Sequence, residues 1–282
     1  MVVIKADKRK ERFNKNKIIN SLLKIGLEKD KALEIAQQAK EELKGKITTD
    51  EIFNFVTSKL ENYNLLYAGK YNLRRAVMNL GPTGYPFEKY IARVLNTYDF
   101  TTKTNQVLNG KCVFHEVDIL AHKNNDFYFI ECKYHNTRGG KSDVKVPLYI
   151  HSRFLDLKAN LKEKNKYHYQ MWLITNTKFT TEALKYGECM KIKMTGWAYP
   201  QNNSLEEIIG KNEAYPINLF KGILNNLDYQ KLVKLDVILL KDLLEFSLKD
   251  LISKTKIKEE KISKLYRLAL ELCPTYENKN KK

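Results

Sequence analysis

The chain has 282 residues, a length that allows one long domain or two to three small ones. It carries 50 Lys and Arg against 33 Asp and Glu, a formal net charge of +17, which predicts a polyanionic partner. The sequence lacks the apolar run of about 18 residues that a transmembrane helix needs, and its N-terminus is not of the signal type, so we expect nucleic acid rather than a membrane as the partner. The four cysteines are not paired closely as in secreted disulfide scaffolds, which predicts a cytoplasmic location.

Residues 1–80 predict a short basic strand followed by a bundle of four helices. The segment Thr48-Thr49-Asp50-Glu51 matches a capping box, in which a Ser or Thr and a Glu three residues later satisfy the free N–H groups of a helix start. Gly26 suits the end of the first helix. We expect the four helices at about Asn14–Ile25, Glu28–Lys44, Thr49–Leu60 and Leu65–Asn79.

Two stretches of this region, Val3-Ile4-Lys5 with Phe13-x3-Lys17-Ile18 and Tyr67 to Arg75, resemble an ATP-cone, the nucleotide-binding regulatory module of ribonucleotide reductases. The resemblance implies a bound ATP or dATP, with its triphosphate held by Lys5, Lys17, Arg74 and Arg75. Ala6 and Lys8 depart from the family's arginine and glycine, and alanine cannot supply a forked phosphate contact. The nearby lysines and arginines either rebuild a phosphate pocket or face DNA. The sequence contains no glycine-rich P-loop, so we do not expect ATP hydrolysis.

Gly84 to Leu95 predicts an amphipathic helix that opens the next part of the chain. Pro86 suits its first turn, and Glu88 lies at the edge of the buried face. That face is formed by apolar residues at i, i+3, i+4, i+7 and i+8, namely Phe87, Tyr90, Ile91, Val94 and Leu95.

The segments His115–Leu120 and Phe129–Lys133 predict a β-hairpin around Asn124-Asn125, a pair that suits a tight turn with positive φ. Pairing outward from this turn places Asp118 opposite Glu131, and Glu116 opposite Lys133. Facing carboxylates repel each other unless a cation lies between them, and Mg2+ or Mn2+ is the natural occupant of such a site. Side-chain alternation directs Cys132 into the core, and its backbone carbonyl becomes a candidate further ligand.

The spacing Asp-x12-Glu-x-Lys resembles the signature of the PD-(D/E)xK nucleases, and its surroundings resemble the Mrr-like restriction endonucleases. The resemblance covers residues 81–216, with the helix at Gly84 before the hairpin and Met171–Ala183 as a later strand, turn and helix. It implies a catalytic set of Glu88, Asp118, Glu131 and Lys133, with Asp118, Glu131, Glu88 and the Cys132 carbonyl as metal ligands.

Residues 141–161 predict a helix that covers the sheet beside this site. Polar side chains are interleaved with its apolar ones, and among them we expect His151 and Arg153 to lie near DNA. A histidine satisfied at the edge of the core is the alternative for His151.

From residue 217 onward the sequence predicts short Leu- and Lys-rich helices up to residue 275, and then a disordered tail over 276–282. The segment around Thr255 resembles helix-hairpin-helix modules, which grip DNA phosphates with backbone N–H groups and lysines. Lys254, Lys256 and Lys258 are the implied DNA-binding residues, although Lys256 stands where such a hairpin has glycine. A dimerising or packing bundle is the alternative, and a homodimer stays open.

The combined prediction is an α/β protein of three parts: an ATP-cone-like bundle, a PD-(D/E)xK core with a mixed sheet, and helix-hairpin-helix-like short helices. We expect an Mg2+-dependent endonuclease of double-stranded DNA, of the restriction or defence type, that responds to ATP or dATP. Two alternatives are a nucleotide-responsive DNA-binding regulator that does not cleave, and a repair or Holliday-junction resolvase.

Overall fold

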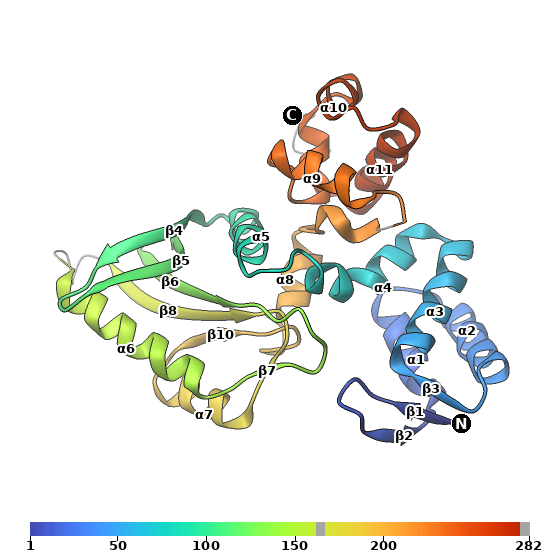
Figure 1. Ribbon diagram of the computed structural model, residues 1–282, viewed down its shortest axis with the longest axis horizontal. Helices are drawn as coiled ribbons and strands as arrows, with labels where there is room; N and C mark the ends of the chain where they lie inside the picture. Colours follow the sequence, from blue (N-terminus) through green and yellow to red (C-terminus); the bar gives the residue numbers. More distant parts are fainter. Residues whose placement is uncertain (162–166, 221, 277–282) are drawn as a thin grey trace. The chain divides into compact units, whose positions relative to one another are not determined.

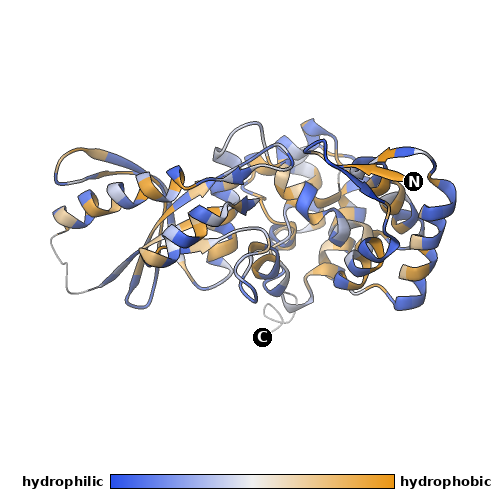
Figure 2. Cartoon of the chain, turned by 90° about the horizontal axis from the view of Figure 1, so that it is seen from below, coloured by the Kyte–Doolittle hydropathy of each residue, from blue (hydrophilic) through white to orange (hydrophobic). Residues whose placement is uncertain are grey.

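The computed structural model describes residues 1–161, 167–220 and 222–276 and divides the chain into two compact units, Met1–Arg75 and Ala76–Lys282 (Figure 1). The tail expected at 276–282 lies outside the described residues apart from Tyr276. Helices of the chain carry hydrophobic and hydrophilic residues side by side (Figure 2), as expected for elements that bury one face. Within the described residues, no helix is long and apolar enough to cross a membrane.

The first unit is a small sheet with four helices. Its elements are β1 (Val2–Ile4), β2 (Lys10–Arg12), α1 (Lys15–Lys24), α2 (Lys29–Glu42), β3 (Lys46–Thr48), α3 (Thr49–Tyr63) and α4 (Leu65–Met78), whose last turn follows the boundary between the units. Strand β1 lies in the middle, antiparallel to β2 and parallel to β3. Buried residues of α1, α2 and α3, including Leu22, Ile35 and Leu60, form its core.

The helix starts expected in this unit are confirmed. Thr48 and Glu51 form the reciprocal capping box at the start of α3, with Glu51 N–H donating to Thr48 Oγ1 at 3.1 Å. The expectation of one strand was wrong, because β2 and β3 complete a three-stranded sheet. Strand β2 reads Lys-Glu-Arg and lies at a sheet edge, so it lacks the alternating apolar residues by which a strand is recognised.

The second unit contains a mixed five-stranded sheet, as expected. Its strands are β4 (Thr101–Asn109), β5 (Phe114–Lys123), β6 (Asp126–Lys133), β8 (His168–Thr175) and β10 (Lys193–Thr195), in the order β10-β8-β6-β5-β4. Strands β4, β5 and β6 pair antiparallel, and β6, β8 and β10 pair parallel. Two short strands, β7 (Lys141–Ser142) and β9 (Lys178–Phe179), form a separate parallel pair.

Helices cover both faces of this sheet. Helix α5 (Tyr85–Asn96) lies on one face, and α6 (Lys145–Asn160) and α7 (Thr181–Cys189) lie on the other (Figure 1). All five predicted apolar positions of α5 are buried, and Pro86 stands in its first turn. Helix α6 connects the parallel strands β6 and β8, and its buried face packs with α7 residues over Leu173. The amphipathic helix and the covering helix are thus confirmed, although the covering helix begins at Lys145 rather than Lys141, because Lys141–Ser142 pair with β9 as strand β7.

Three similar helix–turn segments follow the sheet. Helices α8 (Leu205–Lys211), α9 (Asn226–Lys234) and α10 (Leu248–Thr255) begin at the N-caps Ser204, Asn225 and Ser247. A residue with positive φ follows each helix: Glu213 (51°), Asp236 (60°) and Lys256 (55°). The segments continue into the 3-10 helices η1 (Ile217–Phe220) and η2 (Leu240–Glu245) and into helix α11 (Glu259–Leu272). The short-helical region therefore begins near Ser204.

The first two of these turns pair with each other. Ile217 N–H donates to Ile238 O at 3.0 Å, and Leu240 N–H donates to Tyr215 O at 2.7 Å. Helix α5 anchors this part, since Tyr90 Oη donates to Ala214 O at 2.8 Å and Arg93 pairs with the buried Asp242 at 3.0 Å. The third of these helix–turn segments has its turn at Lys256, between α10 and α11.

Candidate functional site

The carboxylates predicted to face each other lie where strands β5 and β6 part. The antiparallel ladder runs from Lys123–Asp126 to Ile119–Ile130, which confirms the register set by the Asn124 turn. Asp118 is the next residue of β5, and its Oδ2 accepts the Cys132 N–H of β6 at 2.7 Å. A side chain of β5 thus bonds to the β6 backbone, which holds the carboxylate at the end of the ladder.

Glu131 lies on the sheet face covered by α6, and two residues of that helix bind it. Arg153 Nη1 donates to Glu131 Oε2 at 2.6 Å, and Tyr149 Oη donates to Glu131 Oε1. Tyr149 and Arg153 are four residues apart, so they lie on the same side of the helix. Tyr149 is not among the residues predicted above, and its spacing of four residues before Arg153 was the available signal.

Glu88 reaches the same region from the first turn of α5. Burial, followed by the charges of Glu116 and Glu131, raises the pKa of the Glu88 carboxyl. Gly84 approaches it closely: a Cβ at Gly84 would lie 3.1 Å from Glu88 Oε1. Helix α5 and the strands β5 and β6 therefore bring together the acidic residues that the sequence predicted.

Negative charge exceeds positive charge around the acidic cluster formed by Glu88, Asp118 and Glu131. Burial raises the pKa of Asp118 to about 7, and the charges of Glu131 and Glu88 add to the shift, whereas the Cys132 N–H and Arg153 oppose it. Neighbouring carboxylates that cannot all ionise without a counter-charge favour a bound cation.

Lys133 follows Cys132 at the end of β6, and the backbone around it is held by two residues of β8 and its following turn. Thr175 Oγ1 donates to Lys133 O at 2.7 Å. The buried Asn176 accepts the His135 N–H at 2.9 Å and donates to His135 O at 2.8 Å. Burial, followed by the charge of Lys133, lowers the pKa of His135, so the Lys133 ammonium group lies close enough to this histidine to act on it.

The donor set fits a hard divalent cation in chemical type, because carboxylate oxygens are the ligands that Mg2+ and Mn2+ prefer. Glu88, Asp118 and Glu131 would hold it. In the part of the chain that the structure describes, no three His, Cys, Asp or Glu side chains are yet arranged around a common metal position. Both carboxylate oxygens of Glu131 are bonded to α6.

The remaining predicted DNA-binding residues are dispersed. His151 Nδ1 lies 2.8 Å from Tyr186 Oη and joins α6 to α7, which is the edge-of-core alternative for this histidine. Lys254, Lys256 and Lys258 surround the turn between α10 and α11, and Lys256 takes the left-handed conformation despite its side chain. The Lys254 ammonium lies 5.3 Å from the centre of the Phe246 ring.

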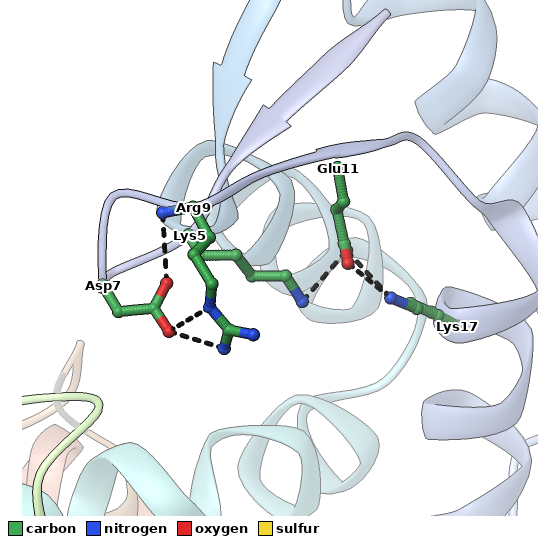
Figure 3. A network of polar contacts seen from close by, with 5 residues as sticks. All are labelled: Lys5, Asp7, Arg9, Glu11 and Lys17. Carbon is green, nitrogen blue, oxygen red and sulfur yellow. Dashed lines mark hydrogen bonds and ion pairs between the residues drawn. The ribbon is translucent and has the colours of Figure 1, made fainter.

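The first unit contains a cavity of about 210 Å³ that both predicted nucleotide lysines line. Glu11 bridges them: its carboxylate lies 2.9 Å from Lys5 Nζ and 2.8 Å from Lys17 Nζ (Figure 3). Lys17 and then Lys5 lower the pKa of Glu11. The cavity wall also contains polar residues that were not predicted from the sequence: Glu11, Asn14, Ser21, Thr49 and Tyr71.

The turn after Lys5 keeps its shape although glycine is absent from it. Lys8 has a φ of 64°, and Lys5 N–H donates to Arg9 O at 2.8 Å. Asp7 binds Arg9 at 2.6 Å beside this turn (Figure 3). The replacement of glycine by Lys8 therefore leaves the turn in place.

The predicted arginines do not join the cavity wall. Arg75 pairs with Asp50, donates to Asn54 Oδ1 at 2.8 Å and stacks on Phe53 with its guanidinium carbon 3.3 Å from the ring centre. Burial lowers the pKa of Arg75 to about 10. Neither Arg74 nor Arg75 is among the residues that line the cavity around Lys5 and Lys17.

Comparison with known proteins defines the N-terminal part as an ATP-cone domain, matched over residues 1–78. A 131-residue stretch is 40% identical to an uncharacterized protein of Archaeoglobus fulgidus, covering 46% of this chain and 71% of that protein. The crystal structure of a protein of unknown function, AF1548, is 30% identical and superposes with a TM-score of 0.55, covering 68% of this chain and 100% of that one. The chain therefore belongs to the family of the uncharacterized Archaeoglobus fulgidus protein.

Proposed function

We propose that this protein is a metal-dependent endonuclease that hydrolyses phosphodiester bonds in double-stranded DNA. The observation that carries the proposal is the meeting of Glu88, Asp118 and Glu131 at the open end of the β5–β6 pair, with Lys133 two residues beyond Glu131 at the end of β6. A site that only gripped DNA has no use for carboxylates against a phosphate backbone. The net charge of +17 suits a polyanionic substrate.

Each residue has a chemical role in this proposal. A divalent ion would be held by Asp118, Glu131, Glu88 and the Cys132 carbonyl; when bound, it would polarise the phosphate and lower the pKa of a water molecule. Lys133 orients the attacking water and offsets the charge that develops on the phosphate oxygens. Asn176 and Thr175 hold the backbone from which Lys133 projects. The similarity of the Asp-x12-Glu-x-Lys spacing to Mrr-like enzymes supports a restriction or defence role.

We further propose that ATP or dATP regulates the enzyme through the ATP-cone domain. Lys5 and Lys17 line one cavity there, and the Glu11 carboxylate marks the position at which both already bind an anion. A triphosphate would compete with Glu11 for these two cations. The proposal does not need Arg75, which is engaged on α3.

Incubation of the purified protein with supercoiled plasmid tests both proposals. We expect nicked or linear DNA with Mg2+ or Mn2+, none with chelator, and a changed rate when ATP or dATP is added. Tight DNA binding without cleavage under every metal condition would instead favour a DNA-binding regulator, an alternative supported by the engagement of Glu131 with Arg153. Preferential cutting of four-way junctions would favour a resolvase.

A further inference from the structure

The Arg153 side chain binds the Glu131 carboxylate, which is a proposed ligand of the metal ion. Arg153 Nη1 binds Glu131 Oε2 at 2.6 Å, and the other oxygen accepts the Tyr149 hydroxyl. The guanidinium carbon also lies 5.3 Å from the centre of the Tyr149 ring, so the two α6 residues support each other. Each Glu131 oxygen thus already carries one donor, which an approaching ion would have to displace or share the oxygen with.

The pair is well protected from solvent. The Glu131 and Arg153 side chains are 15% and 26% exposed, so water and salt screen their attraction weakly. An ion pair of this kind is a genuine competitor for a cation, unlike an exposed surface pair, which contributes little.

The single positive charge of Arg153 does not neutralise the acidic cluster. The acidic residues at this end of the sheet are Glu88, Glu116, Asp118 and Glu131. Three of them, Glu88, Asp118 and Glu131, lie close enough to interact with one another and with Arg153; when ionised, their three negative charges exceed the one positive charge of Arg153 by two, the charge of one divalent ion. The cluster thus retains the charge to attract an ion even with Arg153 in place.

We propose that Arg153 is a positioning residue of this site that exchanges partners: it holds Glu131 before the metal binds, and it moves to a DNA phosphate once the ion takes Glu131. The inference rests on the proposed nuclease function. A guanidinium released beside a metal-bound phosphodiester is suited to its new ligand, because its forked N–H groups match phosphate oxygens. Metal binding and DNA binding would then be coupled through one side chain.

The coupling predicts opposite effects of one substitution on two measurements. The Arg153→Ala variant lacks the side chain that competes with the ion for Glu131. Mn2+ should therefore bind the full-length variant about tenfold more tightly than wild type, which corresponds to about 1.4 kcal/mol of binding free energy. The KM for DNA at saturating Mn2+ should rise because the phosphate contact is lost. A second variant, Arg153→Gln, keeps a polar donor at this position and should shift both quantities in the same directions. Lys158→Ala, on the same helix, is the control and should change neither.

Calorimetric titration with Mn2+ separates the possible outcomes, with thermal melting to verify folding. Equal or weaker Mn2+ binding by both Arg153 variants, in a protein whose binding still depends on Asp118, would overturn the partner exchange and leave the nuclease proposal standing. If neither wild type nor the variants bind Mn2+, both proposals fail. Tighter binding with an unchanged KM for DNA would overturn the phosphate half of the exchange.

Discussion

At the scale of single residues, the site depends on where each charge finds a partner. Asp118 accepts a hydrogen bond from the Cys132 backbone N–H, and Glu131 accepts hydrogen bonds from Tyr149 and Arg153. The charge of Lys133 acts on His135. In the ATP-cone domain, Glu11 satisfies Lys5 and Lys17 in the same way. Both sites thus contain an internal ion pair at the position where an external ligand is proposed to bind.

The catalytic role of this set predicts a separation of cleavage from binding. Asp118→Ala, Glu131→Ala and Lys133→Ala should each slow plasmid cleavage by roughly a hundredfold to a thousandfold or more, as for other groups that act on the transition state. DNA affinity, measured by gel shift in chelator so that no protein carries metal, should stay close to that of wild type. Lys103→Ala, an exposed lysine of β4, is the control for loss of one positive charge. Cleavage by Lys133→Ala at the wild-type rate would exclude the assignment.

The raised pKa of Asp118 predicts how stability depends on pH. The folded state raises this pKa from 3.8 to about 7, so between about pH 4 and pH 7 the native protein holds a proton that the unfolded chain has released. The free energy of unfolding should therefore fall as the pH rises through this window. Asp118→Asn keeps the acceptor for Cys132 N–H and removes the charge.

In chelator, Asp118→Asn should be more stable than wild type at pH 8, by about 2 to 4 kcal/mol in urea denaturation. The difference should shrink toward pH 4, where both side chains are neutral. Added Mg2+ should reverse the order at pH 8, because only the carboxylate binds the ion. Identical urea midpoints for the two proteins across the whole range would show that Asp118 is not strained by its neighbours.

At the scale of elements, helices α8, α9 and α10 are each followed by a residue in the positive-φ conformation, which favours glycine, although none of the three residues is glycine. Glu213, Asp236 and Lys256 all have positive φ, and the first two lie in turns that pair with each other. The third turn, at Lys256, joins two helices with lysines on both sides. This arrangement suits a segment in which two turns serve packing and one presents cations.

Replacement of Lys256 tests the backbone conformation of that turn. Lys256→Gly should raise the free energy of unfolding by about 0.5 to 1 kcal/mol, because glycine adopts positive φ without the steric cost of a side chain. Lys254→Gly, inside α10, should lower it by about 1 kcal/mol. Equal effects of the two substitutions on thermal melting would mean that the left-handed turn does not form in solution.

At the scale of the whole molecule, an ATP-cone domain is joined to a mixed α/β unit whose relatives are uncharacterized. A ligand that binds one folded unit stabilises that unit, whichever activity the other unit has. Nucleotide binding can therefore be tested by melting, independently of the nuclease activity, which is tested by cleavage.

Nucleotide binding should appear as thermal stabilisation that depends on Lys17. Free ATP or dATP at about a hundred times its dissociation constant adds roughly 2.7 kcal/mol to the stability of the domain that binds it. We expect the melting temperature of wild type to rise in millimolar nucleotide, and that of Lys17→Ala to stay constant. Lys40→Ala, an exposed lysine of α2, should respond as wild type does. The absence of a shift with any nucleotide would leave the domain with a structural or DNA-facing role.

Local chemistry was readable from the sequence where neighbours in the chain determine it. The capping box at Thr48, the buried stripe of α5 and the Asn124 turn each depend on residues a few positions apart, and the structure confirms all three. The hairpin register followed from the turn alone, since each residue after it has one possible partner. The charged edge strand β2 escaped prediction because it buries no apolar face.

Only the tertiary structure decided which charges meet. Arg153 and Tyr149 reach Glu131 because α6 crosses back over the sheet, Glu11 bridges Lys5 and Lys17 because β2 lies beside α1, and Arg75 is held on α3 by Asp50. Opposite charges select their partners by distance and burial after folding, and spacing in the chain carries little information about either. The sequence by itself determined the residue types of both sites and the local elements that bear them. Packing decided whether each cation is held by the protein or left for a ligand.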